Sequence, residues 1–252
     1  MPYKVRNIFL CNICILIAAS YAASFTVPLE IVNGISANIS DYPYVALLRI
    51  QNYPSCGASF ISNTTLLTAA HCVQTVDIQN LTIQVGSSVA SENPSEIIQV
   101  KSKIPHDLFC TDAQCLDYDI AVVTIVSAPQ NFDVVPVKLN EARIVTGILG
   151  TVLGWGYDGV NEGELHKLEV PIKDNSECSE VYYSDINFSE RMMCAGGQGG
   201  DYCWGDSGGP LTVDDILVGI ATWSSGCGED NKPGVYVNVS EFRSWIQENT
   251  GI

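Results

Sequence analysis

The 252-residue sequence predicts an all-β fold, and two features of the chain lead to that prediction. Short runs of β-branched and apolar residues recur along it, and Gly, Pro, Asn and Asp fill the gaps between them. Only the C-terminal segment has the periodicity of an amphipathic helix. Many short strands with turn signals are typical of a barrel or a sandwich, and composition leaves open whether there is one such unit or two fused barrels.

The predicted elements are six clear strands followed by one helix. In the helix, we expect Ser240 to cap the N-terminus and Glu241 to begin the first turn. Phe242, Trp245 and Ile246 follow the i, i+3, i+4 spacing of one buried face. The strands are expected at 44–50, 81–85, 120–125, 148–153, 216–221 and 235–237.

The composition supports a sizeable core and excludes one class of partner. Hydrophobic residues make up 46% of the chain and charged residues 16%, which is unlike a disordered protein. The 12 Lys and Arg residues face 28 Asp and Glu residues, for a net charge of −16. Such an acidic surface repels phosphate backbones, so we expect no nucleic-acid partner.

The N-terminus has the three parts of a secretory signal. Lys4 and Arg6 precede an apolar run over 8–19, and Ser20-Tyr21-Ala22 follows as the cleavage region, with small residues at its first and last positions. We expect residues 1–22 to be the signal peptide, with cleavage after Ala22 or Ala23. The run is too short to cross a bilayer and no later apolar run reaches its length. The sequence therefore predicts a secreted, extracellular protein without a membrane anchor.

The cysteine count agrees with export, because an even number remains after the signal. Cys11 and Cys14 leave with the signal peptide. An even set in a secreted chain predicts four disulfides, although eight cysteines allow 105 pairings. A zinc site is the competing interpretation, but no Cys-x-x-Cys pair is present among the eight, so we expect no metal. The eight are Cys56, Cys72, Cys110, Cys115, Cys178, Cys194, Cys203 and Cys227.

Five Asn-x-Ser/Thr triplets make the chain a candidate glycoprotein. Such triplets are common by chance, so they are compatible with secretion and do not establish it. Their asparagines are Asn38, Asn63, Asn80, Asn187 and Asn238.

Among three histidines, His71 is the candidate general base. It follows an apolar segment in Thr68-Ala69-Ala70-His71-Cys72, and a disulfide at Cys72 can fix its backbone. A base must be held in one orientation, which such a site provides. We expect His106 and His166 to lie in polar loops facing solvent.

Ser207 and Asp119 are the candidate partners of that base. Ser207 lies in Gly205-Asp206-Ser207-Gly208-Gly209-Pro210, where glycines permit a tight turn that presents backbone N–H groups. A serine becomes a good nucleophile only when a histidine takes its proton. The alternative is that this glycine-rich segment is only a structural turn. Asp119 stands at the start of an apolar strand, where a buried carboxylate requires a partner such as an imidazole N–H.

Together these motifs resemble the chymotrypsin-like, trypsin-fold serine peptidases. The resemblance rests on the three segments around His71, Asp119 and Ser207 in that order, and it extends from Ile31 to the C-terminus. It implies two perpendicular six-stranded antiparallel β-barrels with the site between them and a C-terminal helix. It also implies a short propeptide over 23–30 and a peptidase domain over 31–252. Four further segments match motifs of the family: 31–34, 154–156, 222–223 and 232–236.

The resemblance assigns a role to each site residue. Ser207 would attack the scissile carbonyl, His71 would take its proton, and Asp119 would hold the imidazole. The N–H groups of Gly205 and Ser207 would form the oxyanion hole. No cofactor is expected, and none of this chemistry requires a metal. We expect a monomer that acts on protein or peptide substrates and meets protein protease inhibitors.

The resemblance also implies three of the disulfides. Cys110 and Cys115 then remain, and we expect them to close a small loop before Asp119. The implied pairs are Cys56–Cys72, Cys178–Cys194 and Cys203–Cys227.

Activation in the family begins with a cut before a residue like Ile31. The new ammonium would pair with Asp206 and order the site. Glu30 stands where Arg or Lys is usual, so we expect an activating protease of another specificity.

The expected specificity pocket contains one residue that is typical of trypsin-like members and several that differ from the family pattern. Asp201 stands six residues before Ser207 and, with Gly234, favours cleavage after Arg or Lys. The alternative is a solvent-facing loop aspartate. Three residues of the pocket region depart from the family pattern and keep open a non-tryptic specificity: Tyr202, Thr222 and Ser224. Tyr202 and Glu30 also keep open a binding or decoy role without strong catalysis. Trp204 at the pocket rim and Trp223 are further candidate substrate contacts.

Overall fold

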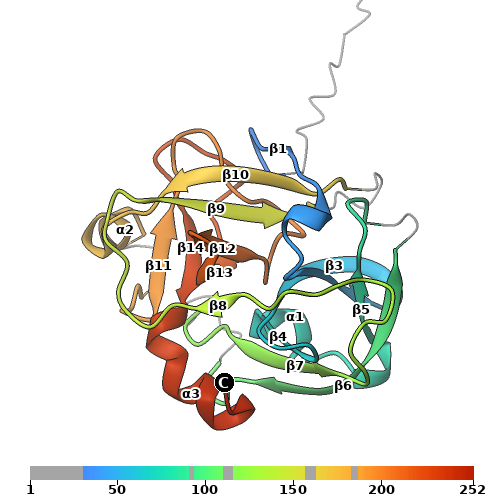
Figure 1. The fold of residues 1–252 in the computed structure, drawn as a ribbon. Helices are drawn as coiled ribbons and strands as arrows, with labels where there is room; N and C mark the ends of the chain where they lie inside the picture. The colour runs from blue at the N-terminus through green and yellow to red at the C-terminus, as the bar shows by residue number, and fades with distance from the viewer. Residues whose placement is uncertain (1–30, 91–93, 110–115, 157–162, 183–186) are drawn as a thin grey trace, which may run out of the picture.

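A computed structural model describes residues 31–90, 94–109, 116–156, 163–182 and 187–252. Figure 1 shows two groups of strands with a helix at the C-terminal end of the chain, as the all-β prediction requires. The predicted fold class is thereby confirmed. The expected loop disulfide of Cys110 and Cys115 lies outside the described residues.

The first group is a closed barrel of six antiparallel strands. Its order is β2-β3-β4-β7-β6-β5, and β5 pairs with β2 to close the ring. Side chains that alternate along these strands fill the interior, including Leu48, Phe60 and Ile83, all fully buried. The strands are β2 (Val45–Ile50), β3 (Tyr53–Phe60), β4 (Thr65–Thr68), β5 (Leu81–Val85), β6 (Glu96–Pro105) and β7 (Ala121–Ile125).

The second group is an eight-stranded sheet that curls back on itself. Its path is β1-β10-β9-β12-β13-β14-β11, with β8 paired to β13. A bridge between Ile172 and Ala195 joins the end of β10 to β11, so six of these strands form a second barrel. The strands are β1 (Ile35–Ser36), β8 (Lys138–Leu139), β9 (Leu149–Gly154), β10 (His166–Pro171), β11 (Met192–Ala195), β12 (Pro210–Val213), β13 (Ile216–Trp223) and β14 (Gly234–Asn238).

One apolar cluster joins the two barrels. Leu47 and Leu67 of the first barrel lie in the same buried cluster as Leu153 and Ile220 of the second. Burial of this shared surface contributes roughly 25 cal/mol for each square ångström of apolar area removed from water. The barrels therefore meet through a fixed interface, and loops from both can meet at its edge.

The C-terminal helix is present, but it starts later than predicted. A 3-10 turn, η3 (Val239–Phe242), precedes α3 (Arg243–Thr250), whose N-cap residue is Phe242. The prediction that Ser240 caps the helix is wrong, because its hydroxyl bonds to Asn238 Oδ1 instead, at 2.8 Å. Phe242 and Ile246 are buried as expected.

Shorter helical elements occur in the connections between strands. In α2 (Asn175–Val181) the Asp174 side chain accepts from Ser176 N at 2.8 Å, an N-cap that the sequence analysis missed although Asp174 and Glu177 are its usual signal. The others are α1 (Ala70–Val73), η1 (Ile39–Asp41) and η2 (Ile78–Asn80).

The prediction that the other two histidines are solvated loop residues is wrong in part: His106 lies in the loop after β6 but is half-buried, and His166 lies in a strand. His166 begins β10 and pairs with Gly154. His106 packs between the rings of Tyr118 and Trp245, with ring centroids 4.7 and 5.0 Å away. Burial lowers the pKa of His106, which favours its neutral form in this aromatic setting.

Three disulfides fasten the described chain, and they are the three that the resemblance implies: Cys56–Cys72, Cys178–Cys194 and Cys203–Cys227. Of the predicted glycosylation sites, Asn238 is only 7% exposed and its amide donates to Glu190 O at 3.4 Å, so a glycan has no room there. Within the described ranges, the longest helix is far too short and polar to cross a bilayer.

Candidate active site

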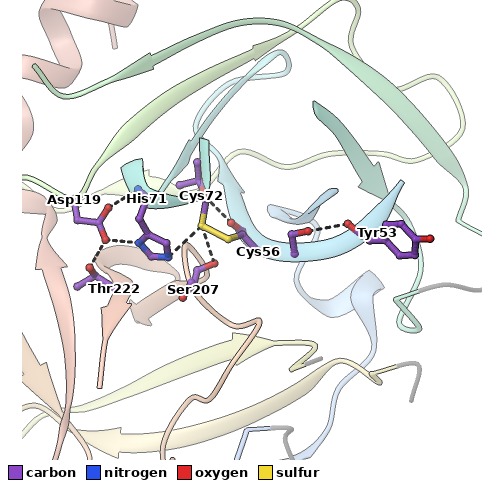
Figure 2. The surroundings of a disulfide bond; sticks show 10 residues. Tyr53, Cys56, His71, Cys72, Asp119, Ser207 and Thr222 are labelled. Carbon is purple, nitrogen blue, oxygen red and sulfur yellow. Dashed lines mark hydrogen bonds and ion pairs between the residues drawn. A yellow bond between two sulfur atoms is a disulfide. The ribbon is translucent and has the colours of Figure 1, made fainter. Parts of the chain in front are cut away.

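His71 is held at one end of the first barrel by its neighbours in α1. The Cys56–Cys72 disulfide ties α1 to β3, directly beside the imidazole. Figure 2 shows the His71 ring between the carboxylate of Asp119 and Ser207. The His71 side chain is 37% exposed, so one edge of the ring stays open to a ligand.

The carboxylate of Asp119 is buried and receives three hydrogen bonds. Its Oδ2 atom lies 2.6 Å from His71 Nδ1, and its Oδ1 accepts from the backbone N–H of His71 at 2.8 Å. The hydroxyl of Thr222 in β13 also donates to Oδ2. Because Nδ1 carries the proton toward Asp119, Nε2 is left without one and can accept a proton from elsewhere.

The ionisation of His71 follows from this pairing. Burial by itself lowers the pKa of the imidazole, but the hydrogen bond that His71 donates to Asp119 and the negative charge of Asp119 together raise it by more, so the net pKa lies above 6.5. Asp119 therefore stabilises the imidazolium that forms when Nε2 takes a proton.

Ser207 lies in a turn between Asp206 and β12, on the second barrel. Cys72 Sγ contacts both His71 Nε2, at 3.6 Å, and the carbonyl oxygen of Ser207, at 3.8 Å. A disulfide sulfur has no proton to donate, so these are contacts and not hydrogen bonds. They place Nε2 on the side of the imidazole that faces the Ser207 turn.

The turn also presents two free backbone donors. Gly205 has a φ of +90°, which a residue with a side chain rarely adopts. Within the part of the chain that the structure describes, the N–H groups of Gly205 and Ser207 have no hydrogen-bond partner. Two adjacent unpaired donors are suited to a developing oxyanion.

The first barrel fixes the position of the Ser207 turn through Gly57, a residue that the sequence analysis missed. Gly57 N donates to Ser207 O at 2.8 Å, and Thr68 Oγ1 donates to Gly57 O at 2.8 Å. A Cβ on Gly57 would lie 2.6 Å from Gly209 Cα. The absence of a side chain at position 57 therefore lets the two barrels approach each other at the Ser207 turn.

Arg191 is a second residue that the sequence did not reveal, because it lies 72 residues from Asp119. Its guanidinium bonds both oxygens of Asp117: Nε donates to Oδ1 at 3.1 Å and Nη2 donates to Oδ2 at 2.5 Å. The guanidinium also stands 4.3 Å from the Tyr118 ring centroid. Tyr118 has a φ of +60°, which is strained for a residue with a side chain. Arg191 thus holds the strained turn that leads into Asp119.

The predicted activation residues are both buried. Ile31 is 2% exposed, and Val32 N donates to Asp201 O at 2.8 Å. The Asp206 carboxylate is fully buried and accepts from Gly156 N, at 2.8 Å, and from Cys203 N, at 2.9 Å.

The predicted pocket residues divide into buried and open ones. Asp201 and Tyr202 are 1% and 2% exposed, whereas Trp204 is 72% exposed next to the Ser207 turn. Trp223 ends β13 and Ser224 follows it, with its hydroxyl donating to Gly226 O at 2.7 Å. Asp201 is therefore not the solvent-facing loop residue of the alternative interpretation.

Asp201 has an unusual electrostatic environment. Burial raises the pKa of its carboxyl to about 7, although hydrogen bonds from Tyr202 N, Gly234 N and the Tyr236 hydroxyl act in the opposite direction. Both oxygens already accept hydrogen bonds from the protein itself.

Comparison with known proteins agrees with the geometry. The trypsin family model matches residues 31–246. A trypsin of Phaedon cochleariae is 37% identical over 89% of this chain and 90% of its own length, and trypsin eta of Drosophila melanogaster is 35% identical over 90% of each. A solved structure of HL collagenase superimposes with a TM-score of 0.79 at 30% identity, covering 88% of this chain and 99% of the collagenase chain.

The chain belongs to the trypsin family of chymotrypsin-like serine peptidases. It is accordingly a serine endopeptidase, and proteins of this family act on protein substrates.

Proposed function

We propose that this chain is a secreted endopeptidase that cleaves peptide bonds through an acyl-enzyme on Ser207, with His71 as the base and Asp119 as its orienting partner. The observation that carries the proposal is the pairing of His71 Nδ1 with Asp119 Oδ2 at 2.6 Å. This pairing fixes the tautomer whose free Nε2 faces the Ser207 turn. Secretion is supported by the N-terminal signal pattern and by the disulfides.

The chemistry proceeds in two transfers. Ser207 Oγ attacks the scissile carbonyl carbon while its proton passes to His71 Nε2, and the N–H groups of Gly205 and Ser207 bind the oxyanion. The imidazolium then protonates the leaving amine, and the C–N bond breaks to leave an ester on Ser207. Water attacks that ester with the same base, which releases the acid and restores the hydroxyl.

Activation by cleavage before Ile31 is part of the proposal. An ammonium at Ile31 would meet the buried Asp206 carboxylate, and a buried charge of this kind requires a partner. Glu30 points to an activating protease that cuts after an acidic or otherwise non-basic residue. N-terminal sequencing of the active protein should give Ile31 as the first residue, and any other start would refute this step.

Two preferences are candidates for the residue that precedes the cleaved bond. Asp201 and Gly234 predict cleavage after Arg or Lys, whereas Tyr202 keeps a non-tryptic specificity open. The surroundings of Asp201 favour the non-tryptic specificity, because its carboxylate is buried and already accepts hydrogen bonds from Tyr202 N and Gly234 N.

Covalent labelling tests the nucleophile directly. The processed protein is treated with an organophosphate, and we expect one adduct on Ser207, found by peptide mass mapping. The matched control is Ser207→Ala, which should fold, as judged by its thermal unfolding, but should neither label nor cleave peptides. A folded, processed wild-type protein that does not label would refute the catalytic proposal and favour the binding or decoy role.

A further inference from the structure

Tyr202 occupies the space that Gly234 leaves open. The Tyr202 side chain is almost fully buried, and its ring stacks edge to face on Tyr236 with centroids 5.1 Å apart. A Cβ placed on Gly234 would lie 2.5 Å from Tyr202 Cε1. The ring edge therefore lies directly against the Gly234 backbone.

The hydroxyl of Tyr202 locks the ring in this position. It lies 2.7 Å from the carbonyl oxygen of Val235 in β14 and also bonds to the carbonyl oxygen of Trp223 at the end of β13. The bonds join two neighbouring strands across the place where a pocket between them would reach inward. Rotation of the ring out of this position would break the hydrogen bond that the hydroxyl, with its single proton, donates to one of these oxygens, and would empty the buried space that the ring fills, both of which are costly.

The carboxylate of Asp201 is already hydrogen-bonded by the chain. Oδ1 accepts from Tyr202 N at 2.8 Å and from the Tyr236 hydroxyl at 3.2 Å, and Oδ2 accepts from Gly234 N. With 1% exposure, the carboxylate has no open face toward solvent. A guanidinium or ammonium could reach it only if the surrounding chain moved, and the Tyr202 ring edge is part of that surrounding, because Cε1 and both carboxylate oxygens lie within 2.7 Å of the place of a Cβ on Gly234.

We infer that Tyr202 determines the specificity of this enzyme by forming an aromatic floor over Asp201, so that the pocket accepts short uncharged side chains and rejects Arg and Lys. The inference rests on the proposed acyl-enzyme chemistry at Ser207. A basic side chain on this floor would lose its hydration without gaining an ionic partner, whereas Ala, Val or Leu would contact an apolar surface.

The decisive experiment compares peptide substrates that differ only in the residue before the cleaved bond: Ala, Val, Leu, Phe, Lys or Arg. The processed wild-type protein should have a kcat/KM for the best short uncharged residue at least about 100-fold above that for Arg. Tyr202→Ser removes the floor and should raise kcat/KM for Arg by about 100-fold. Tyr202→Phe is the matched control: it keeps the ring and should keep the exclusion of Arg.

A second measurement uses an inhibitor in place of a substrate. An aromatic amidine inhibits by placing its cation on a pocket carboxylate, so it should inhibit the wild type weakly and Tyr202→Ser strongly. Adding Asp201→Ala to Tyr202→Ser should abolish both the new Arg cleavage and the inhibition.

Organophosphate labelling of the wild type separates the two proposals. A wild type that labels on Ser207 but cleaves best after Arg, or binds the amidine tightly, overturns the role of Tyr202 and leaves the peptidase mechanism intact. A wild type that neither labels nor cleaves any peptide overturns both.

Discussion

His71 and Asp119 are joined twice: Nδ1 of the imidazole lies 2.6 Å from one carboxylate oxygen, and the His71 backbone N–H donates to the other at 2.8 Å. The single buried carboxylate of Asp119 thus fixes both the imidazole ring and the backbone of His71. The second bond makes the orientation of His71 depend on Asp119 even when the imidazole is neutral.

The pH dependence of activity should reflect this pair. Only the neutral imidazole accepts a proton from Ser207, and Asp119 raises the pKa of His71 above 6.5 despite the opposing effect of burial. Activity should therefore be full at high pH and should fall as pH decreases through a midpoint above 6.5. The measurement is kcat/KM against pH on an uncharged peptide. Activity that persists well below this range would exclude His71 as the base.

Asp119→Asn should reduce kcat by about 10⁴-fold, the loss that the equivalent change causes in a related serine peptidase. Any remaining activity should titrate at a lower pH, because the charge that raises the His71 pKa has been removed. Single-turnover kinetics across the same pH range would show both effects. A midpoint equal to that of the wild type would contradict the assigned coupling.

Thr222→Val should weaken activity mildly. The Thr222 hydroxyl donates to Asp119 Oδ2, and its loss leaves a buried carboxylate with one donor fewer, at a cost of about 1–3 kcal/mol in unfolding free energy. We expect a fall in kcat of about tenfold or less, because both His71 bonds remain. Thr222→Ser keeps the hydroxyl and is the control; equal losses in the two variants would show that the methyl packing matters and not the hydrogen bond.

Gly57→Ala should separate the barrels at the site. The new Cβ would lie 2.6 Å from Gly209 Cα, and the neighbouring atoms are backbone that cannot rotate away. We expect a loss of about 1–3 kcal/mol in stability, together with a fall in kcat of about 100-fold from the displaced Ser207 turn. Gly147→Ala is the control, because a Cβ there meets nothing within 4 Å and only its φ of +85° is strained. Comparable kcat losses in both variants would refute the steric account.

The Cys56–Cys72 disulfide should contribute to catalysis as well as to stability. Removing it by Cys56→Ala with Cys72→Ala should lower the unfolding free energy by about 3 kcal/mol and should also lower kcat, because α1 holds His71. Removing Cys178–Cys194, which has the same separation of 16 residues, is the matched control. Similar stability losses are expected, with kcat retained in the control. Equal kcat losses would show that the effect is general loosening of the fold.

The sequence predicted the features that depend on local pattern. Short runs of β-branched and apolar residues between turn signals marked strands such as β5 and β7, because these residue types favour the extended backbone and pack well in a sheet wherever it lies. Family motifs pointed to His71, Asp119 and Ser207. Local pattern failed at the start of α3, where a 3-10 turn occupies the expected first turn, and at His106, whose aromatic neighbours come from Tyr118 and the distant Trp245.

By itself, then, the sequence determined the all-β class, the export pattern and the identity of the residues that could perform acyl transfer. Only the tertiary structure decided that Gly57 of one barrel supports Ser207 of the other, that Arg191 holds the turn before Asp119, and that the Tyr202 ring lies against Gly234. These relationships join residues 150 positions apart (Gly57 and Ser207), 74 positions apart (Arg191 and Asp117) and 32 positions apart (Tyr202 and Gly234). Their energies come from packing and hydrogen bonds between strands, and those arise only when the chain has folded.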